Sequence, residues 1–180
     1  MSRKNQTVNL VMTGLCIAIG IVLPMAFHSV PNAGSVILPM HIPVLLCGLI
    51  CGPIYGLASG ILTPALSSLL TQMPPMAYLP SMLCELAIYG LVAGLAIRLI
   101  RTKSNVANVY LSLVAAMLCG RVIYGVVNAL IFQAGRYSME LWLTASFVTA
   151  LPGIIIQLVA IPVLVLLLQK AGLIRSVQNA

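Results

Sequence analysis

The 180-residue sequence contains no aspartate, and Glu85 and Glu140 are its only acidic residues. Charged residues make up 6% of the chain, whereas an average soluble domain has about 25%. With so few carboxylates, neither a carboxylate-clustered metal site nor a two-metal phosphotransfer centre can form. The motif G-x-x-x-x-G-K-S/T is also missing, which excludes ATP hydrolysis at a P-loop.

Apolar residues, in contrast, are abundant. They make up 61% of the chain, and the mean hydropathy is +1.13. This composition indicates an integral membrane protein, and at about 20 apolar residues per crossing the length allows about six helices. We therefore expect one all-α membrane domain over residues 1–180, a six-helix bundle with spans at about residues 7–27, 39–51, 54–70, 81–99, 107–132 and 143–169.

The distribution of basic residues predicts how the bundle is oriented. Seven of the nine would lie on the side that carries both termini: Arg3, Lys4, Arg98, Arg101, Lys103, Lys170 and Arg175. An excess of Lys and Arg marks cytoplasmic loops, so both termini are predicted to be cytoplasmic and loops 28–38, 71–80 and 133–142 to face outward. Because the positive charges sit at the ends of apolar runs, they indicate topology rather than a nucleic-acid partner.

Two ionisable residues, Glu85 and Arg121, fall inside predicted spans. Charged side chains within a membrane are unfavourable and usually functional. The two residues either form a structural ion pair or meet a polar ligand in an outward-facing cavity. Polar stripes on three helices favour the cavity: Ser81, Glu85 and Tyr89; Arg121, Tyr124, Gly125, Asn128 and Phe132; Ser146, Thr149, Gly153 and Gln157.

The substrate-binding candidates are the polar members of these stripes and two residues near the outer surface. His41 opens the second predicted span, and Trp142 lies at the outer boundary, although both positions also suit residues of the membrane interface. The full set is Glu85, Tyr89, Arg121, Tyr124, Asn128, Gln157, His41 and Trp142. We expect no catalytic residue and no metal site. The two histidines lie near the outer edge of the predicted bundle, and the five cysteines lie in apolar runs, where they are expected to be small buried hydrophobic residues.

Small residues recur at four-residue spacing on four predicted helices, which lets helix backbones approach closely in lipid. For Gly48, Gly52, Gly56 and Gly60, and for Gly90 and Gly94, internal packing is the favoured interpretation. For Gly14 and Ala18 on the first helix, an internal contact and a contact with a partner's helix remain open.

The order and spacing of these features resemble the S components of energy-coupling factor (ECF) transporters, over nearly the whole chain. The resemblance rests on Gly14-Leu-Cys-Ile-Ala18, on Leu38-Pro-Met-His-Ile-Pro43 after an outer loop, on the glycine-rich stretch 46–60, on Glu85-Leu-Ala-Ile-Tyr-Gly90-Leu-Val-Ala-Gly94 and on Gly120-Arg121. It implies a substrate-binding subunit of a multi-pass prokaryotic cell-membrane importer that captures a vitamin-like molecule from outside.

The resemblance also implies partners: a transmembrane scaffold subunit and two ATPases, with ATP used by those subunits and no cofactor in this chain. In the family the small-x-x-x-small face of the first helix docks on the scaffold, which here corresponds to Gly14 and Ala18. The nickel and cobalt branch begins with the residues found here at Met40-His-Ile-Pro43 and uses their free amino terminus. Because this motif is internal, metal transport is not expected.

The substrate expected from the sequence bears a carboxylate, because arginine presents a bidentate donor fork to such groups. Pantothenate or nicotinate would fit Arg121, with folate and precursors of thiamine or queuosine as alternatives. A rival interpretation is an autonomous secondary carrier in which Glu85 takes up and releases a proton.

Overall fold

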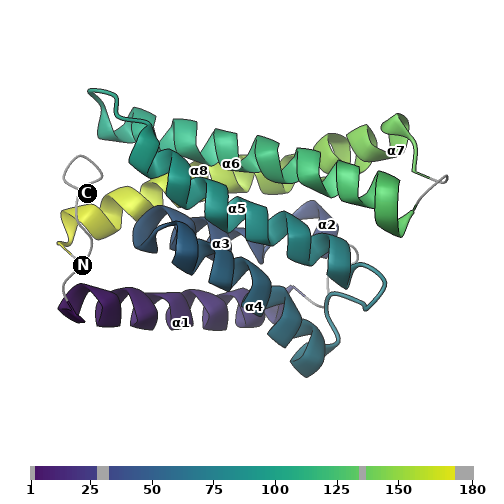
Figure 1. Cartoon of the computed structure of the whole chain (residues 1–180), viewed down its shortest axis with the longest axis horizontal. Coiled ribbons are helices and arrows are strands. Elements are labelled where there is room, and N and C mark those ends of the chain that lie inside the picture. The colour runs from purple at the N-terminus through teal and green to yellow at the C-terminus, as the bar shows by residue number, and fades with distance from the viewer. Residues whose placement is uncertain (1–2, 28–32, 134–136, 173–180) are drawn as a thin grey trace.

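The computed structural model describes residues 3–27, 33–133 and 137–172, and in them it contains helices and no strand. Along the chain these are α1 (Arg3–Ala26), α2 (Ala33–Val36), α3 (His41–Cys51), α4 (Pro53–Thr71), α5 (Leu79–Leu99), α6 (Asn105–Val127), η1 (Asn128–Phe132), α7 (Met139–Leu143), η2 (Thr144–Thr149) and α8 (Leu151–Lys170). The segments η1 and η2 are π-helical turns. The long helices lie side by side in one bundle (Figure 1).

Six stretches within these ranges are long and apolar enough to cross a membrane: Gln6–Ala26, Gly34–Cys51, Pro53–Thr71, Leu79–Leu99, Asn105–Phe132 and Leu151–Lys170. The predicted all-α six-helix membrane fold is therefore confirmed. The second crossing differs from a plain helix, because α3 has 11 residues and would extend only about 16 Å. Leu38 at φ 55° and Pro39 interrupt the helix, and α2 supplies the rest of that stretch.

Glycines form the contact between α4 and α5. A Cβ atom at Gly56 or Gly60 would collide with the backbone of Gly90 or Leu86, and one at Gly90 would collide with the backbone of Gly56. Gly48 faces the Gly90 carbonyl in the same way. The internal packing predicted for these residues is thus confirmed. At the Gly52 turn between α3 and α4, the backbone has φ 99°, a conformation that favours glycine.

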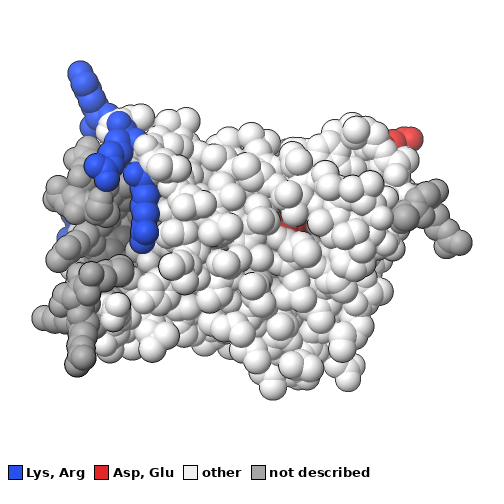
Figure 2. All heavy atoms as spheres, viewed as in Figure 1, with Lys and Arg blue, Asp and Glu red and all other residues white. Residues whose placement is uncertain are grey.

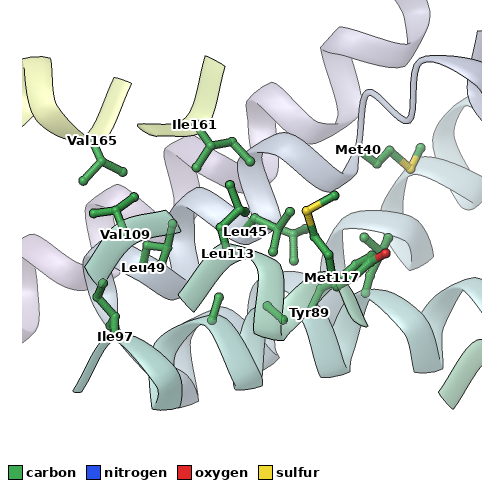
Figure 3. Close-up of a cluster of buried hydrophobic side chains, with 14 residues drawn as sticks. Met40, Leu45, Leu49, Tyr89, Ile97, Val109, Leu113, Met117, Ile161 and Val165 are labelled. Atoms are coloured by element: carbon green, nitrogen blue, oxygen red, sulfur yellow. The ribbon is translucent and has the colours of Figure 1, made fainter. Parts of the chain in front are cut away.

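The apolar core lies between α3, α5, α6 and α8 (Figure 3). It runs along the bundle from Ile97 and Val165 to Met40 and Tyr89. Tyr89 is fully buried, so the core ends on a residue with a polar group. Polar side chains begin at this end of the core.

Basic side chains gather at the end of the bundle where α1 begins and α8 ends (Figures 1 and 2). Arg98 closes α5, Arg101 and Lys103 follow it, and Lys170 closes α8. The surface between the two ends of the bundle is almost free of charge in Figure 2. The described helix ends at residues 3 and 170 therefore lie at the same end of the bundle (Figure 1), as an even number of crossings requires.

Helix α1 packs on α3 and α4, but much of its surface faces outward. Gly14 and Ala18 are exposed, and a Cβ atom at Gly14 would meet no other atom within 4 Å. Among the described residues, Gly14 therefore has no internal helix contact, which leaves lipid or a partner's helix as its neighbour.

Candidate functional site

A cavity of about 650 Å³ lies at the end of the bundle opposite the basic residues. It is bounded by the end of α1, the segment from Gly34 to His41, the connection between α4 and α5, and the first turns of α5. Arg121 and Tyr124 of α6 and Ala145 of η2 complete it. Most of the wall is apolar, formed by Pro24, Phe27, Leu38, Pro39, Met40, Met73, Pro74, Pro75, Tyr78 and Met82.

The ionisable cluster of the cavity wall comes from three helices. Arg121 Nη1 lies 3.2 Å from Glu85 Oε1, and His41 Nε2 lies 3.7 Å from the same oxygen. The side chains of all three residues are at least 94% buried. The imidazole also packs edge-on against the Tyr89 ring, with 5.2 Å between centroids. Glu85 is therefore the centre of a buried cluster that also contains Arg121 and His41.

Several polar atoms of this cluster make no hydrogen bond to any described residue. They are His41 Nδ1 and Nε2, Glu85 Oε1, and Arg121 Nε and Nη2. Buried polar atoms are nearly always hydrogen-bonded, and each exception calls for an explanation. Five such atoms around one cavity are expected for a site that a polar ligand or water completes.

Trp142 fixes the position of Arg121 from the outside of the bundle. Its indole Nε1 donates a hydrogen bond of 3.0 Å to the Arg121 carbonyl oxygen. The indole ring packs on Gly125, where a Cβ atom would collide with it. Helix α6 passes into the π-turn η1 three residues later, at Asn128, and π-turns are frequent at functional sites.

Comparison with known proteins identifies the family. The family described as ECF transporter, substrate-specific component, matches residues 8–165. The chain belongs to this family. No curated protein and no solved structure matches it significantly. The chain is thus the substrate-specific (S) component of an ECF transporter, a transporter subunit that binds a small molecule and associates with an energy-coupling module.

Four of the eight predicted site residues of this S component line the cavity: His41, Glu85, Arg121 and Tyr124. Glu85 and Arg121 form the ion pair of one interpretation and also line a cavity, as the other interpretation requires. Contact with a polar ligand there stays a prediction. Ser81, from the polar stripe of α5, lines it as well.

The other four predicted residues do not line the cavity. Tyr89 lies one turn beyond Glu85 and packs against Gly120. The side-chain amide of Asn128 donates to the Tyr124 carbonyl oxygen at 2.8 Å, and Trp142 turns toward α6. Gln157 is fully buried in α8 and makes no hydrogen bond to a described residue.

The wall of the cavity includes residues that sequence reasoning missed, chiefly Phe27, Met40, Met73 and Met82. Apolar residues at such positions cannot be told from lipid-facing or core residues by spacing alone. The three methionines in this wall do point to a binding surface once the structure brings them together, because methionine is flexible and common at adaptable binding surfaces.

Proposed function

We propose that this S component captures a small water-soluble vitamin or a similar micronutrient from outside a prokaryotic cell. One observation carries the proposal: a cavity large enough for such a molecule has a buried cluster of Glu85, Arg121 and His41 in its wall. Cavities of about 300–1,000 Å³ with an apolar lining and a few convergent polar groups are typical of small-molecule sites.

The charge distribution supports an outward-facing cavity. Arg98, Arg101, Lys103 and Lys170 lie at the opposite end of the bundle, and cytoplasmic ends of membrane helices carry the excess of Lys and Arg. With that end in the cytoplasm of a cell membrane, the connection between α4 and α5 faces the exterior. Substrate then reaches Glu85 and Arg121 without crossing the apolar core.

Delivery inward is proposed to require a partner module of one scaffold subunit and two ATPases. The chain has no P-loop motif with which to use ATP itself. Gly14 and Ala18 are small residues exposed on the side of α1 that faces away from the bundle, which suits close contact with a partner's helix. This face is the proposed docking surface for the scaffold subunit.

The sequence predicts a carboxylate-bearing substrate, such as pantothenate or nicotinate, because an arginine presents a bidentate donor fork to such groups. In the structure Arg121 is paired with Glu85 at 3.2 Å. The prediction is untested, but the argument that supported it is weaker once the charge of Arg121 is balanced.

Reconstitution distinguishes the capture subunit from the proton-coupled carrier. Vesicles that contain the chain alone would be given an inward proton gradient and a mixture of radiolabelled water-soluble vitamins, and accumulation would be counted. The proposal expects binding without accumulation, and accumulation only after the complete ATP-driven module is added. Accumulation by the chain alone, abolished by Glu85→Gln and retained in the matched control Glu140→Gln, would establish the carrier instead.

A further inference from the structure

We infer that the cavity takes an uncharged, largely apolar molecule that places a hydrogen-bond donor beside an acceptor, as a lactam, a primary amide or an amino-substituted heterocycle does. The inference rests on the proposed capture function and deepens it by naming the substrate class. Its basis is the arrangement of Glu85, Arg121 and His41 around one carboxylate oxygen.

The charges of the cavity wall cancel within the protein. Of the residues that line the cavity, Glu85 and Arg121 carry the formal charges, and they lie 3.2 Å apart. The formal charges of Glu85 and Arg121 therefore sum to zero. A net anion would have to leave water for this cavity with no unbalanced positive charge among the described residues of its wall to receive it. Transfer of an unpaired charge from water into a low-dielectric site is strongly unfavourable.

The geometry of Arg121 also works against a carboxylate. A guanidinium binds a carboxylate best with two parallel N–H groups, and each of its two-pronged faces includes Nη2. Arg121 Nη2 and Nε are both buried and make no hydrogen bond to a described residue, while Nη1 is the atom next to Glu85. At the face formed by Nη1 and Nη2, a carboxylate would therefore have to compete with Glu85 for the guanidinium.

What the pair offers instead is an acceptor next to a donor. Glu85 and Arg121 both line the cavity from neighbouring helices, α5 and α6, with their charged atoms in contact. A cis-amide edge has an N–H next to a C=O, so it can donate to the carboxylate and accept from the guanidinium at once. Such a ligand adds hydrogen bonds without separating the ion pair.

The rest of the wall suits the body of such a molecule. Phe27, Met40 and Met82 are apolar, and Pro39, Pro74 and Pro75 present rigid rings. Burial of an apolar ring against this wall supplies affinity in proportion to the area removed from water. The charged pair then selects the polar edge of the ligand.

The test uses the full chain purified in detergent at pH 8, where an ordinary imidazole is neutral. It is incubated with an equimolar mixture of water-soluble vitamins and their matched acid and amide forms, including nicotinate with nicotinamide and biotin with biotinamide. Retained molecules are identified by mass spectrometry after gel filtration. The affinity of each molecule is then measured by the fluorescence of Trp142. This is the chain's single tryptophan, and it donates a hydrogen bond to the Arg121 carbonyl oxygen.

The inference expects the retained molecule to be uncharged, and it expects the amide of that molecule's matched pair to bind at least about tenfold more tightly than the acid. Retention of an anion, a cation or a zwitterion would overturn the inference and leave the capture function standing. Retention of nothing would overturn the capture function itself, so the two failures are distinguishable.

A charge switch gives a second, independent measurement. Glu85→Gln leaves Arg121 without a balancing charge, so the preference should shift toward the acid by at least about tenfold. Glu140→Gln removes the only other acidic residue, which is exposed in the first turn of α7, and should leave the preference unchanged. An unaltered acid-to-amide ratio in a folded Glu85→Gln protein would contradict the inference, and if that variant does not fold, the wild-type measurement still decides.

Discussion

The two halves of α5 meet their neighbours in different ways. The half from Tyr89 to Leu99 packs its glycines directly on backbone, with Gly90 against Gly56 and Gly94 against Pro53. The half from Leu79 to Glu85 borders a cavity and holds a buried carboxylate. In lipid, apolar side chains gain little by meeting each other, so helix association depends on close packing. The glycine half can therefore stabilise the bundle while the polar half keeps groups free for a ligand.

The largest effect is expected from Gly90→Leu, which tests the glycine half. Its Cβ would collide with the carbonyl group and Cα of Gly56, so α4 and α5 would have to separate. We expect no monodisperse protein in fluorescence-detected gel filtration. Gly14→Leu is the matched control, because open space surrounds Gly14, and it should elute as wild type does. A well-folded Gly90→Leu protein would show that the α4–α5 contact is not what holds the bundle.

The next effect concerns the polar half. Arg121→Met leaves Glu85 as an unpaired buried charge, which should lower the free energy of unfolding by about 3–5 kcal/mol. The double variant Glu85→Leu/Arg121→Met removes both charges and should recover most of that loss. Unfolding by SDS titration would measure both. If the double variant is no more stable than Arg121→Met, an unpaired Glu85 is not the cause of the loss, and the contrast between the two halves of α5 weakens.

The sequence predicts the glycine half of this contrast better than the polar half. Spacing placed Gly48, Gly56 and Gly90 at internal contacts, because a helix face that repeats every four residues is a local property. The same reasoning placed Glu85 and Arg121 within reach of each other. Both conclusions need only helix periodicity and helix order.

Helix periodicity could not predict whether a side chain in a polar stripe points into the cavity or into a contact between helices. The stripes on α5 and α6 have members that turn away from the cavity, such as Tyr89 and Asn128, because packing on Gly120 and a hydrogen bond to Tyr124 hold them elsewhere. The π-turns also change the helical register, η1 within the stripe on α6 and η2 within the last stripe. Such shifts depend on contacts between α6 and the chain that follows it, which periodicity does not contain.

A smaller effect is expected from Trp142→Phe. This variant tests whether Trp142 positions Arg121, which pairs with Glu85 in the polar half of α5. The substitution keeps an aromatic ring near Gly125 and removes the hydrogen bond to the Arg121 carbonyl oxygen. Loss of one such bond amounts to about 1 kcal/mol, so ligand affinity should fall roughly fivefold by isothermal titration calorimetry. Tyr110→Phe, at an exposed site on α6, is the control. An unchanged affinity would show that Trp142 does not position Arg121.

The smallest effect on stability is expected from Gly14→Leu, which should impair only transport. Because no atom of the described chain lies within 4 Å of a Cβ atom there, the free energy of unfolding should stay within about 0.5 kcal/mol of wild type, and ligand binding should not change. Uptake by the complete complex should nevertheless stop, because a leucine keeps a partner's helix from close approach. Cys119→Leu, at an exposed position on α6, provides the control for a larger side chain on another face. Full uptake by Gly14→Leu would mean that the scaffold docks elsewhere and that α1 faces lipid. Equal loss in both variants would mean that added bulk acts through the bilayer rather than at a docking surface.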